Sequence, residues 1–213
     1  MTKFKSLING IGNYEQTNKY YDNWSSSYDK TLLSWNYKIP FKASAVLKSY
    51  LDRSPKRLLD LACGTGLFAE EILKIFPNTI IDGIDISKKI LIEAKSKNIY
   101  SKLICSNFDT NLSLKNKYNV ISCIGAMTYT KDPIKLIKDV SKITHNNGFF
   151  IFSHRVDLWK KQKYSNILIN LSKIWEIIYI SRPLLYLPKN VDFNKTIKIK
   201  IALLKKKKDD SKD

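Results

Sequence analysis

Apolar residues along this chain alternate between short continuous runs and helical spacing. Five apolar runs predict strands, at residues 57–62, 79–84, 101–106, 118–124 and 148–154. Helical spacing of apolar positions predicts helices at residues 17–29, 41–52, 66–76, 87–97 and 133–144. The last of these helices is preceded by Asp132 at the capping position and begins with Pro133. Strands that alternate with helices predict an α/β fold, with a mostly parallel sheet and helices on both of its faces.

The same pattern continues to the end of the chain. It predicts a helix near 161–172 and apolar strands near 174–181 and 196–204, with a proline-containing loop over residues 182–195. A chain of 213 residues with 44% hydrophobic residues can bury one sizeable core. We therefore expect a single domain over residues 1–204, made of an N-terminal helical lid (1–52), a cofactor-binding core (57–155) and a C-terminal helix with two strands (156–204), followed by a charged tail (205–213).

The turn after the first strand is the most informative stretch, with the sequence RLLDLACGTG over residues 57–66. Gly64 and Gly66 allow a tight reversal and let a ligand approach the backbone. Asp85 follows Gly66 by nineteen residues, at the end of the second apolar strand, where a carboxylate can bind a ribose hydroxyl pair. The two features predict a site for a cofactor that contains a nucleoside.

Two cofactor classes fit this layout. Residues 64–69 satisfy the loose glycine pattern of nicotinamide-dependent enzymes, which by itself is a weak signal. In those enzymes the first glycine follows the strand directly and the helix N-terminus faces a pyrophosphate. Here the residues Asp-Leu-Ala-Cys (60–63) intervene, which departs from that layout.

The string LLDLACGTG resembles the first motif of class I S-adenosylmethionine-dependent methyltransferases. The resemblance continues, in the same order and spacing, in the second motif (81–87), the adenine-contacting segment (103–109), the fourth strand with its substrate-facing end (118–126) and the fifth strand (147–152). Together these pieces span residues 18–155. Residues 21–29, 37–40 and 98–100 are similar, more narrowly, to the Williams-Beuren-region methyltransferase-like family.

This resemblance implies a Rossmann-like, doubly wound, seven-stranded sheet and S-adenosyl-L-methionine as the cofactor. It implies that the glycine turn packs against the amino-acid half of the cofactor, that Asp85 holds the ribose and that N-terminal tyrosines lie over the cofactor, where an aromatic face favours a cation. The expected cofactor-binding residues are Tyr21, Tyr28, Asp60, Ala62, Cys63, Gly64, Thr65, Gly66, Asp85, Ile86, Asn107, Phe108, Cys123 and Gly125. Several of them fall at strand ends, where the topology of an open sheet also predicts a ligand.

Two residues depart from the family pattern. Ala62 replaces a glycine at the first position of the turn, where a small side chain still fits. Asn107 stands where an aspartate commonly accepts a hydrogen bond from the adenine amino group. An asparagine oxygen can accept the same hydrogen bond without the charge.

The net charge of +18 allows a nucleic-acid partner, because basic surfaces attract phosphate. Only four of the 37 basic residues are arginine, however, and the lysines are spread along the whole chain. Proteins that read bases or clamp phosphates prefer the arginine fork. The fourth motif reads Ile-Gly-Ala-Met (124–127), unlike the Asn/Asp-Pro-Pro-aromatic signature of methylases that act on the amino groups of bases. A small-molecule acceptor is therefore the favoured expectation.

The three cysteines and two histidines show no metal-ligand spacing, so no metal site is expected. We expect the cysteines to be buried, reduced thiols. No leader pattern and no long uninterrupted apolar stretch is visible, which predicts a cytoplasmic protein with no membrane association. The oligomeric state is left open.

Candidates on the acceptor side are Tyr129, His154 and Arg155, beside the lid tyrosines. His154 ends the fifth strand, where its pKa would suit proton removal, and Arg155 could bind an acidic substrate. Tyr129 could line the acceptor pocket. The alternative for Tyr129 and for His154 is a purely structural role, which is the commoner one for such residues, so no catalytic base is assigned.

Three functions stay open at this point. The favoured one is methyl transfer to a small molecule, in which the protein aligns donor and acceptor for in-line displacement. The alternatives are a methyltransferase for nucleic acid or protein, and a protein that binds the cofactor without turnover.

Overall fold

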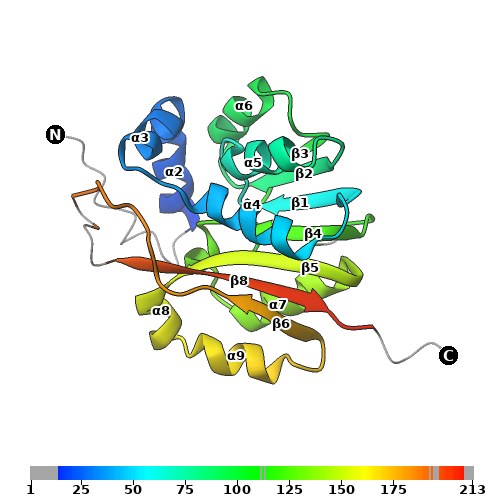
Figure 1. The fold of residues 1–213 in the computed structure, drawn as a ribbon. Helices are drawn as coiled ribbons and strands as arrows, with labels where there is room; N and C mark the ends of the chain where they lie inside the picture. Colours follow the sequence, from blue (N-terminus) through cyan, green and yellow to red (C-terminus); the bar gives the residue numbers. More distant parts are fainter. Residues whose placement is uncertain (1–13, 111, 113, 192, 194–196, 209–213) are drawn as a thin grey trace.

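A twisted, mostly parallel sheet runs through the centre of the protein in the computed structural model, which describes residues 14–110, 112, 114–191, 193 and 197–208 (Figure 1). Its strands lie in the order β3-β2-β1-β4-β5-β8-β6, and β7 pairs with β8 beside this path. Their bounds are β1 (Arg57–Leu61), β2 (Ile80–Asp85), β3 (Lys102–Cys105), β4 (Tyr118–Cys123), β5 (Thr144–Arg155), β6 (Trp175–Ile180), β7 (Leu184–Leu185) and β8 (Lys198–Lys206).

The direction of winding reverses between β1 and β4. The chain moves outward through β2 and β3 on one side of β1 and through β4 and β5 on the other, with parallel pairing throughout. Only β8 runs against this direction, antiparallel to β5, β6 and β7. In an open sheet of this kind, the reversal leaves a crevice at the carboxyl ends of the strands on either side of it. The doubly wound α/β fold predicted from the alternating pattern is confirmed.

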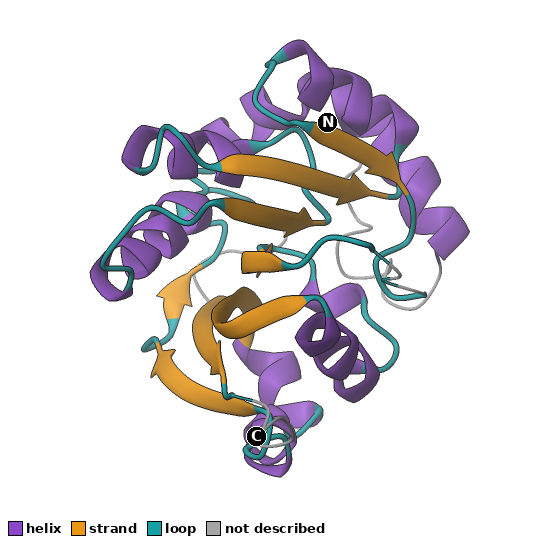
Figure 2. Cartoon of the chain, turned by 90° about the vertical axis from the view of Figure 1, so that its right-hand side faces the viewer, coloured by secondary structure: helices purple, strands orange, loops and turns teal. Residues whose placement is uncertain are grey.

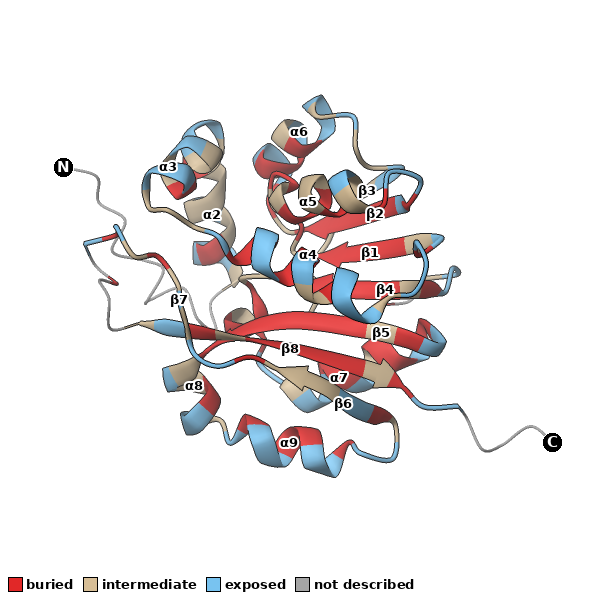
Figure 3. Ribbon diagram, in the orientation of Figure 1, coloured by how far each residue is buried: buried red, intermediate tan, exposed pale blue. Residues whose placement is uncertain are grey.

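Helices cover both faces of the sheet (Figure 2). On one face lie α4 (Ile39–Tyr50) and α5 (Leu67–Ile75), and on the other lie α7 (Pro133–Lys142), α8 (Val156–Lys161) and α9 (Tyr164–Asn170). Successive residues of β1 serve the two faces in turn: Leu58 packs with the first group and Leu59 with the second. The interior is correspondingly divided into two apolar layers, visible as buried segments along β1, β4, β5 and β8 (Figure 3).

The N-terminal segment forms a helical layer over the carboxyl ends of the strands. It consists of α2 (Tyr14–Trp24), the 3₁₀ turn η1 (Ser25–Ser27) and α3 (Tyr28–Ser34), where one helix over 17–29 was expected. The break falls at three serines, because the hydroxyls of Ser25 and Ser27 donate to backbone carbonyls three residues earlier and compete with the helical pattern. We call residues 14–34 the lid; residues 1–13 of the predicted lid lie outside the described residues.

The C-terminal third differs from expectation in three places. The helix expected at 161–172 is observed as the shorter α9, and the unpredicted helix α8 precedes it, with Lys163 between them in the left-handed region (φ 51°). The expected loop over 182–195 contributes the short strand β7, which is an eighth strand beside the predicted seven. Strand β8 continues to Lys206, whose buried ammonium donates to the Thr144 carbonyl at 3.4 Å, so the first two residues of the expected tail belong to the sheet.

The cysteines are free, and Cys63 and Cys123 are buried as expected. Cys105 is exposed, against expectation, because the edge strand β3 has a neighbour on one side only. α6 (Lys88–Ser96) follows β2 and lies against α2 and η1 of the lid. In the part of the chain that the structure describes, no helix combines the length and the apolarity that a bilayer span requires.

Candidate functional site

The turn after β1 is built on left-handed backbone. Ala62, Gly64 and Gly66 have φ values of 52°, 56° and 96°. Glycine reaches this region without penalty, whereas an L-residue there pays roughly 1–2 kcal/mol. Ala62 therefore holds a strained conformation at the position where the family pattern has glycine, and its small side chain lines the cavity described below.

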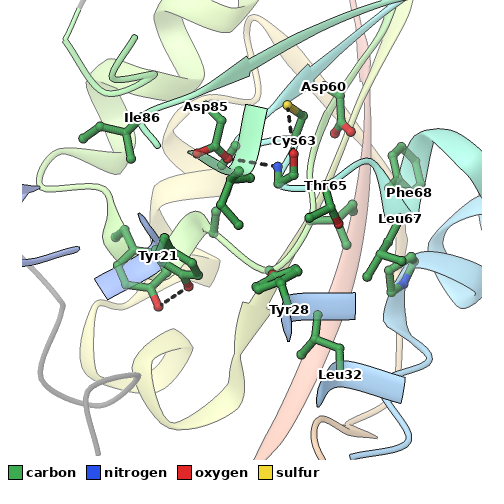
Figure 4. Close-up of a pocket in the computed structure, with 18 of the residues that line it drawn as sticks. Tyr21, Tyr28, Leu32, Asp60, Cys63, Thr65, Leu67, Phe68, Asp85 and Ile86 are labelled. Atoms are coloured by element: carbon green, nitrogen blue, oxygen red, sulfur yellow. Dashed lines mark hydrogen bonds between the residues drawn. The ribbon is translucent and has the colours of Figure 1, made fainter. Parts of the chain in front are cut away.

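Asp85 ties the end of β2 to this turn. Its Oδ2 accepts from the Gly64 amide at 2.9 Å, and its Oδ1 accepts from the Ser87 amide at 2.9 Å (Figure 4). Burial raises the pKa of Asp85, while the backbone amides of Ser87 and Gly64 act in the opposite direction. A carboxylate has about four acceptor positions, so the side chain can still accept from a ligand hydroxyl group.

Asp60, at the end of β1, is the second buried carboxylate of the site. Ser122 donates to its Oδ1 at 2.7 Å and Tyr100 donates to its Oδ2 at 3.0 Å. Burial raises the pKa of Asp60 to about 7, against the lowering effect of those two hydrogen bonds. Asp60 therefore changes charge near neutral pH, in direct contact with the cavity.

Tyrosines face the glycine turn from the lid and from β4. The hydroxyls of Tyr21 and Tyr129 lie 2.9 Å apart, which joins the lid to the 3₁₀ turn η2 (Met127–Tyr129) after β4. The ring of Tyr28 lies over Gly64, where a Cβ atom would be 3.8 Å from the ring edge. Figure 4 shows Tyr21 and Tyr28 across the cavity from Asp85, Cys63 and Thr65.

These groups line a cavity of about 1070 Å³, its open mouth included, at the carboxyl ends of β1, β2 and β4. The structure brings most of the predicted site residues to it. Lining residues that were predicted are Tyr21, Tyr28, Asp60, Ala62, Cys63, Gly64, Thr65, Asp85, Ile86, Asn107, Phe108, Gly125 and Tyr129.

Four predicted or candidate residues are not among those that line the cavity. Gly66 begins α5 with its α-carbon against Ile99 and Tyr100, so its role is to allow close packing. Cys123 is fully buried in the core on the α7 side of the sheet.

His154 and Arg155 end β5. His154 points to the side of α8 and α9, 4.3 Å from the Tyr164 ring centroid, and burial lowers its pKa to about 4. Arg155 is paired with Asp157. Neither residue is among those that line the cavity, so the structure does not support His154 as a base acting there.

Asn107 lines the cavity, but its oxygen is used within its own loop. Oδ1 accepts from the Asp109 amide at 2.9 Å. One of its two acceptor positions is therefore occupied, in contrast to the free oxygen that the sequence suggested. Asp109 is held in turn by hydrogen bonds from the hydroxyls of Tyr14 and Thr130, which connect this loop to the lid.

Sequence reasoning missed thirteen lining residues, which come from the lid, from α4 and the segment before it, from α5, α6 and the segment after β4, and from the loop after β7. They are Tyr14, Thr17, Trp24, Leu32, Tyr37, Pro40, Leu67, Phe68, Ile90, Ile124, Ala126, Tyr186 and Leu187. The aromatic content of residues 14–37 was a usable signal for the first group. Tyr186 and Leu187 had none, because only the return of the chain along β8 brings this loop to the sheet edge.

Two lid carboxylates fasten the lid to the cofactor-binding core. Asp22 accepts at 2.5 Å from the hydroxyl of Ser87, which follows Asp85 by two residues. Asp29 accepts from the hydroxyl of Thr65 in the glycine turn and from the Lys97 ammonium, the latter at 2.7 Å. Lys97 also pairs with Glu70 of α5 at 2.9 Å. The lid is therefore held at two places: at Ser87, after β2, and at Thr65, in the glycine turn.

The sequence of this core matches a family model described as a methyltransferase domain over residues 36–167, more than half of the chain. The protein belongs to this methyltransferase-domain family. The prediction of a methyltransferase, made from the motifs, is confirmed at the level of the family.

Curated relatives of this methyltransferase-domain protein cover part of its length. It is 28% identical over 153 residues to human methyltransferase-like protein 27, a match of 70% of this chain and 61% of the relative. It is 30% identical over 106 residues to a malonyl-[acyl-carrier protein] O-methyltransferase of Halalkalibacterium halodurans, covering 46% of this chain and 39% of the relative. The chain thus spans less than two thirds of these relatives.

Solved structures with the same fold cover 79% to 95% of the methyltransferase-domain protein. The plantazolicin methyltransferase BpumL, crystallised with a monoazolic desmethylPZN analog and SAH, superposes with a TM-score of 0.64 over 95% of this chain and 99% of its own, at 19% identity. The N-methyltransferase NodS of Bradyrhizobium japonicum superposes with a TM-score of 0.59 over 79% of this chain and 98% of its own, at 14% identity. These neighbours establish the fold.

The cavity fits the cofactor expected for this family. Gly64 leaves the turn without a side chain beneath the Tyr28 ring, Asp85 offers carboxylate oxygens as acceptors, and Ile86 and Phe108 supply apolar surface for a flat base. The carboxylates of Asp60 and Asp85 and the surrounding tyrosine rings suit a cationic ligand.

Proposed function

We propose that this protein transfers a methyl group from S-adenosyl-L-methionine to a small-molecule acceptor. The single observation that carries the proposal is the contact between Asp85 and the Gly64 amide at the floor of an aromatic-roofed cavity. The family match supports it, because the matched residues 36–167 include both of these residues.

Each half of the cofactor has candidate partners in this arrangement. Asp85 would accept hydrogen bonds from the ribose hydroxyls, while the backbone around Gly64 would contact the amino-acid half. Ile86 and Phe108 would enclose the adenine, with Asn107 at its edge. When bound, the cofactor supplies an electrophilic methyl group on a sulfonium.

The chain's own contribution to the reaction is alignment and exclusion of water. Lid residues cover the cavity, and orientation of two reactants can lower a barrier by about 7–11 kcal/mol. Burial raises the pKa of Tyr129 far above neutral, so its hydroxyl keeps its proton. We therefore assign positioning roles to Tyr21 and Tyr129 and no role as a base.

The acceptor is treated as a small molecule because the cavity is enclosed by the lid and lies within one domain. The named relatives include O-methyltransferases and an N-methyltransferase, so their names do not choose the acceptor atom. The cytoplasmic location stays a prediction.

Calorimetric titration with S-adenosylhomocysteine tests the cofactor assignment. We expect binding by the wild-type protein and a rise in melting temperature with this ligand but not with NADH, since a ligand at about 100 times its Kd stabilises by about 2.7 kcal/mol. Gly64→Val should abolish binding, because a β-branched residue cannot adopt the left-handed backbone cheaply. Stabilisation by NADH alone would overturn the assignment, and tight binding without transfer to any acceptor class would indicate a binding protein instead.

A further inference from the structure

The acceptor side of the cavity is formed by four tyrosines from separate parts of the chain. Tyr21 comes from α2, Tyr37 precedes α4, Tyr129 ends η2, and Tyr186 follows β7; we call these four the tyrosine wall. The Tyr21 and Tyr129 rings lie 6.2 Å apart, and the Tyr37 and Tyr186 rings lie 5.7 Å apart. The wall adjoins Gly125 at the end of β4, where a Cβ atom would meet the Tyr37 hydroxyl at 2.9 Å.

The charge lining this cavity has the opposite sign to the charge of the protein. The chain carries a net charge of +18, yet the described lining residues include Asp85 and Asp60, which ionises near neutral pH, and no lysine, arginine or histidine. Burial raises the pKa of the wall tyrosines, which therefore stay neutral and present only ring faces and hydroxyls. Such surroundings favour a cation and disfavour an anion.

Arg155 is the basic residue whose charge reaches the wall, and it is already engaged. Its guanidinium donates to both carboxylate oxygens of Asp157, at 2.6 and 3.2 Å, and lies 5.4 Å from the Phe193 ring centroid. It does not line the cavity. A carboxylate acceptor would lose its hydration here without gaining a cationic partner among the described lining residues.

We propose that the acceptor atom is the nitrogen of an uncharged amine, held against the tyrosine wall. This rests on the proposed methyltransferase function. The amine lone pair forms the new N–CH₃ bond as the S–CH₃ bond breaks, and the electron pair of that bond returns to sulfur. The positive charge passes from sulfur to nitrogen and stays among the aromatic rings; an amine that carries hydrogen then loses a proton to water.

The hydroxyl pair of Tyr21 and Tyr129 orients such an acceptor. One hydroxyl donates to the other, which leaves free acceptor positions on both oxygens. An amine N–H that donates to one of these oxygens keeps its own lone pair directed away from the wall, toward the cofactor side. Transfer to a carboxylate would instead cancel the charge that the rings stabilise.

Binding of product-like probes to the protein saturated with S-adenosylhomocysteine tests this proposal. The probes are choline, which carries a trimethylammonium group, its uncharged carbon analogue dimethylbutanol, and the anion dimethylbutanoate. Calorimetry should show choline binding at least about 10-fold more tightly than dimethylbutanol, because desolvated cation–π contacts are worth about 2 kcal/mol. Dimethylbutanoate should bind most weakly.

Variants of Tyr129 separate the contribution of its aromatic ring from that of its hydroxyl group. Tyr129→Phe should keep the preference for choline, whereas Tyr129→Leu should reduce it several-fold. Tyr50→Leu is the matched control, because Tyr50 is an exposed tyrosine of α4 outside the cavity, and it should leave the preference unchanged.

The outcomes distinguish this proposal from the one on which it rests. Binding of S-adenosylhomocysteine together with equal affinities for choline and dimethylbutanol, no choline binding at millimolar concentration, or tighter binding of dimethylbutanoate would overturn the amine acceptor alone. Failure of S-adenosylhomocysteine to bind would overturn the methyltransferase function and, with it, this inference.

Discussion

The Gly64 amide donates to Oδ2 of Asp85 at 2.9 Å, so a side chain at the end of β2 fixes the turn that follows β1. The two residues are twenty-one positions apart in the chain. Their strands are neighbours in parallel register, with Leu61 opposite Ile84, which brings both strand ends to one edge of the sheet. Asp85 thus shapes the glycine turn as well as lining the cavity.

Replacing Asp85 should therefore weaken both cofactor binding and folding. In Asp85→Ala the amides of Gly64 and Ser87 lose their acceptor, and each unsatisfied buried group costs about 1–3 kcal/mol. Asp85→Asn keeps one acceptor oxygen, so its melting temperature should fall between those of wild type and Asp85→Ala. Affinity for S-adenosylhomocysteine, measured by calorimetry, should fall at least about 100-fold in Asp85→Ala.

Asp52→Ala provides the comparison, because Asp52 is exposed and is not among the residues that line the cavity. It should change neither quantity. Equal melting temperatures for wild type and Asp85→Ala would contradict the structural part of this prediction.

Asp29 should slow the release of the cofactor by holding the lid on the glycine turn. Asp29→Asn weakens its contacts with Thr65 and Lys97, so dissociation of S-adenosylhomocysteine in stopped-flow experiments should become several-fold faster. Combination with Lys97→Met should give less than the sum of the two effects, with a coupling of about 0.5–1 kcal/mol for a partly exposed pair.

Lys74→Met is the control for removal of a lysine ion pair, since the Lys74–Glu71 pair lies on α5 and does not involve the lid. Its dissociation rate should equal that of the wild type. Strict additivity of Asp29→Asn and Lys97→Met would argue against a shared contact.

A side chain at Gly125, after β4, should clash with Tyr37, which lies just before α4. Gly125 has a φ of 85°, and a Cβ atom there would lie 2.9 Å from the Tyr37 hydroxyl oxygen. Gly125→Ala should lower the free energy of unfolding by about 1–2 kcal/mol for the backbone conformation, plus a steric contribution. Adding Tyr37→Phe should recover the steric contribution alone.

Gly64→Ala tests this separation by denaturant unfolding. Gly64 also has a positive φ, of 56°, but the nearest atom to its Cβ position is 3.8 Å away. Gly64→Ala should lower the free energy of unfolding by the conformational contribution alone, and adding Tyr37→Phe should recover none of that loss. Equal recovery in both backgrounds would refute a specific contact at Gly125.

Two buried groups should give opposite pH dependence of stability in the same range. The pKa of Asp60 is raised by burial to about 7, so the folded state holds a proton that the unfolded chain releases from about pH 4 upward. Asp60 therefore lowers stability as pH rises from about 4 to 7. The pKa of His154 is lowered by burial to about 4, so the unfolded chain binds a proton that the folded state excludes, and His154 raises stability over about pH 4 to 6.5.

Single variants should separate the two contributions. The free energy of unfolding of Asp60→Asn should rise more steeply with pH below 7 than that of the wild type. The free energy of unfolding of His154→Gln should rise less steeply than that of the wild type, or fall, over about pH 4 to 6.5. Urea unfolding at several pH values measures both slopes. Identical slopes in all three proteins would mean that neither group titrates as its burial implies.

Local patterns were sufficient for the core strands and the glycine turn. Short continuous apolar runs identified the core strands, and the residues around Gly64 and Asp85 pointed to a nucleoside cofactor because such chemistry needs small residues and a carboxylate at strand ends. The family match over residues 36–167 agrees with that interpretation. Boundaries were less accurate where side chains compete with the backbone, as at Ser25 and Ser27.

What the sequence by itself determined, then, was the α/β class, the position of the turn and the donor-type chemistry that its residues favour. The tertiary structure decided which side chains meet across the cavity. It directed His154 toward Tyr164, tied the Asn107 oxygen to Asp109, and brought Tyr186 beside Tyr37. These outcomes depend on packing between segments far apart in the chain, and no local pattern of apolar and polar residues encodes which distant side chain a residue will meet.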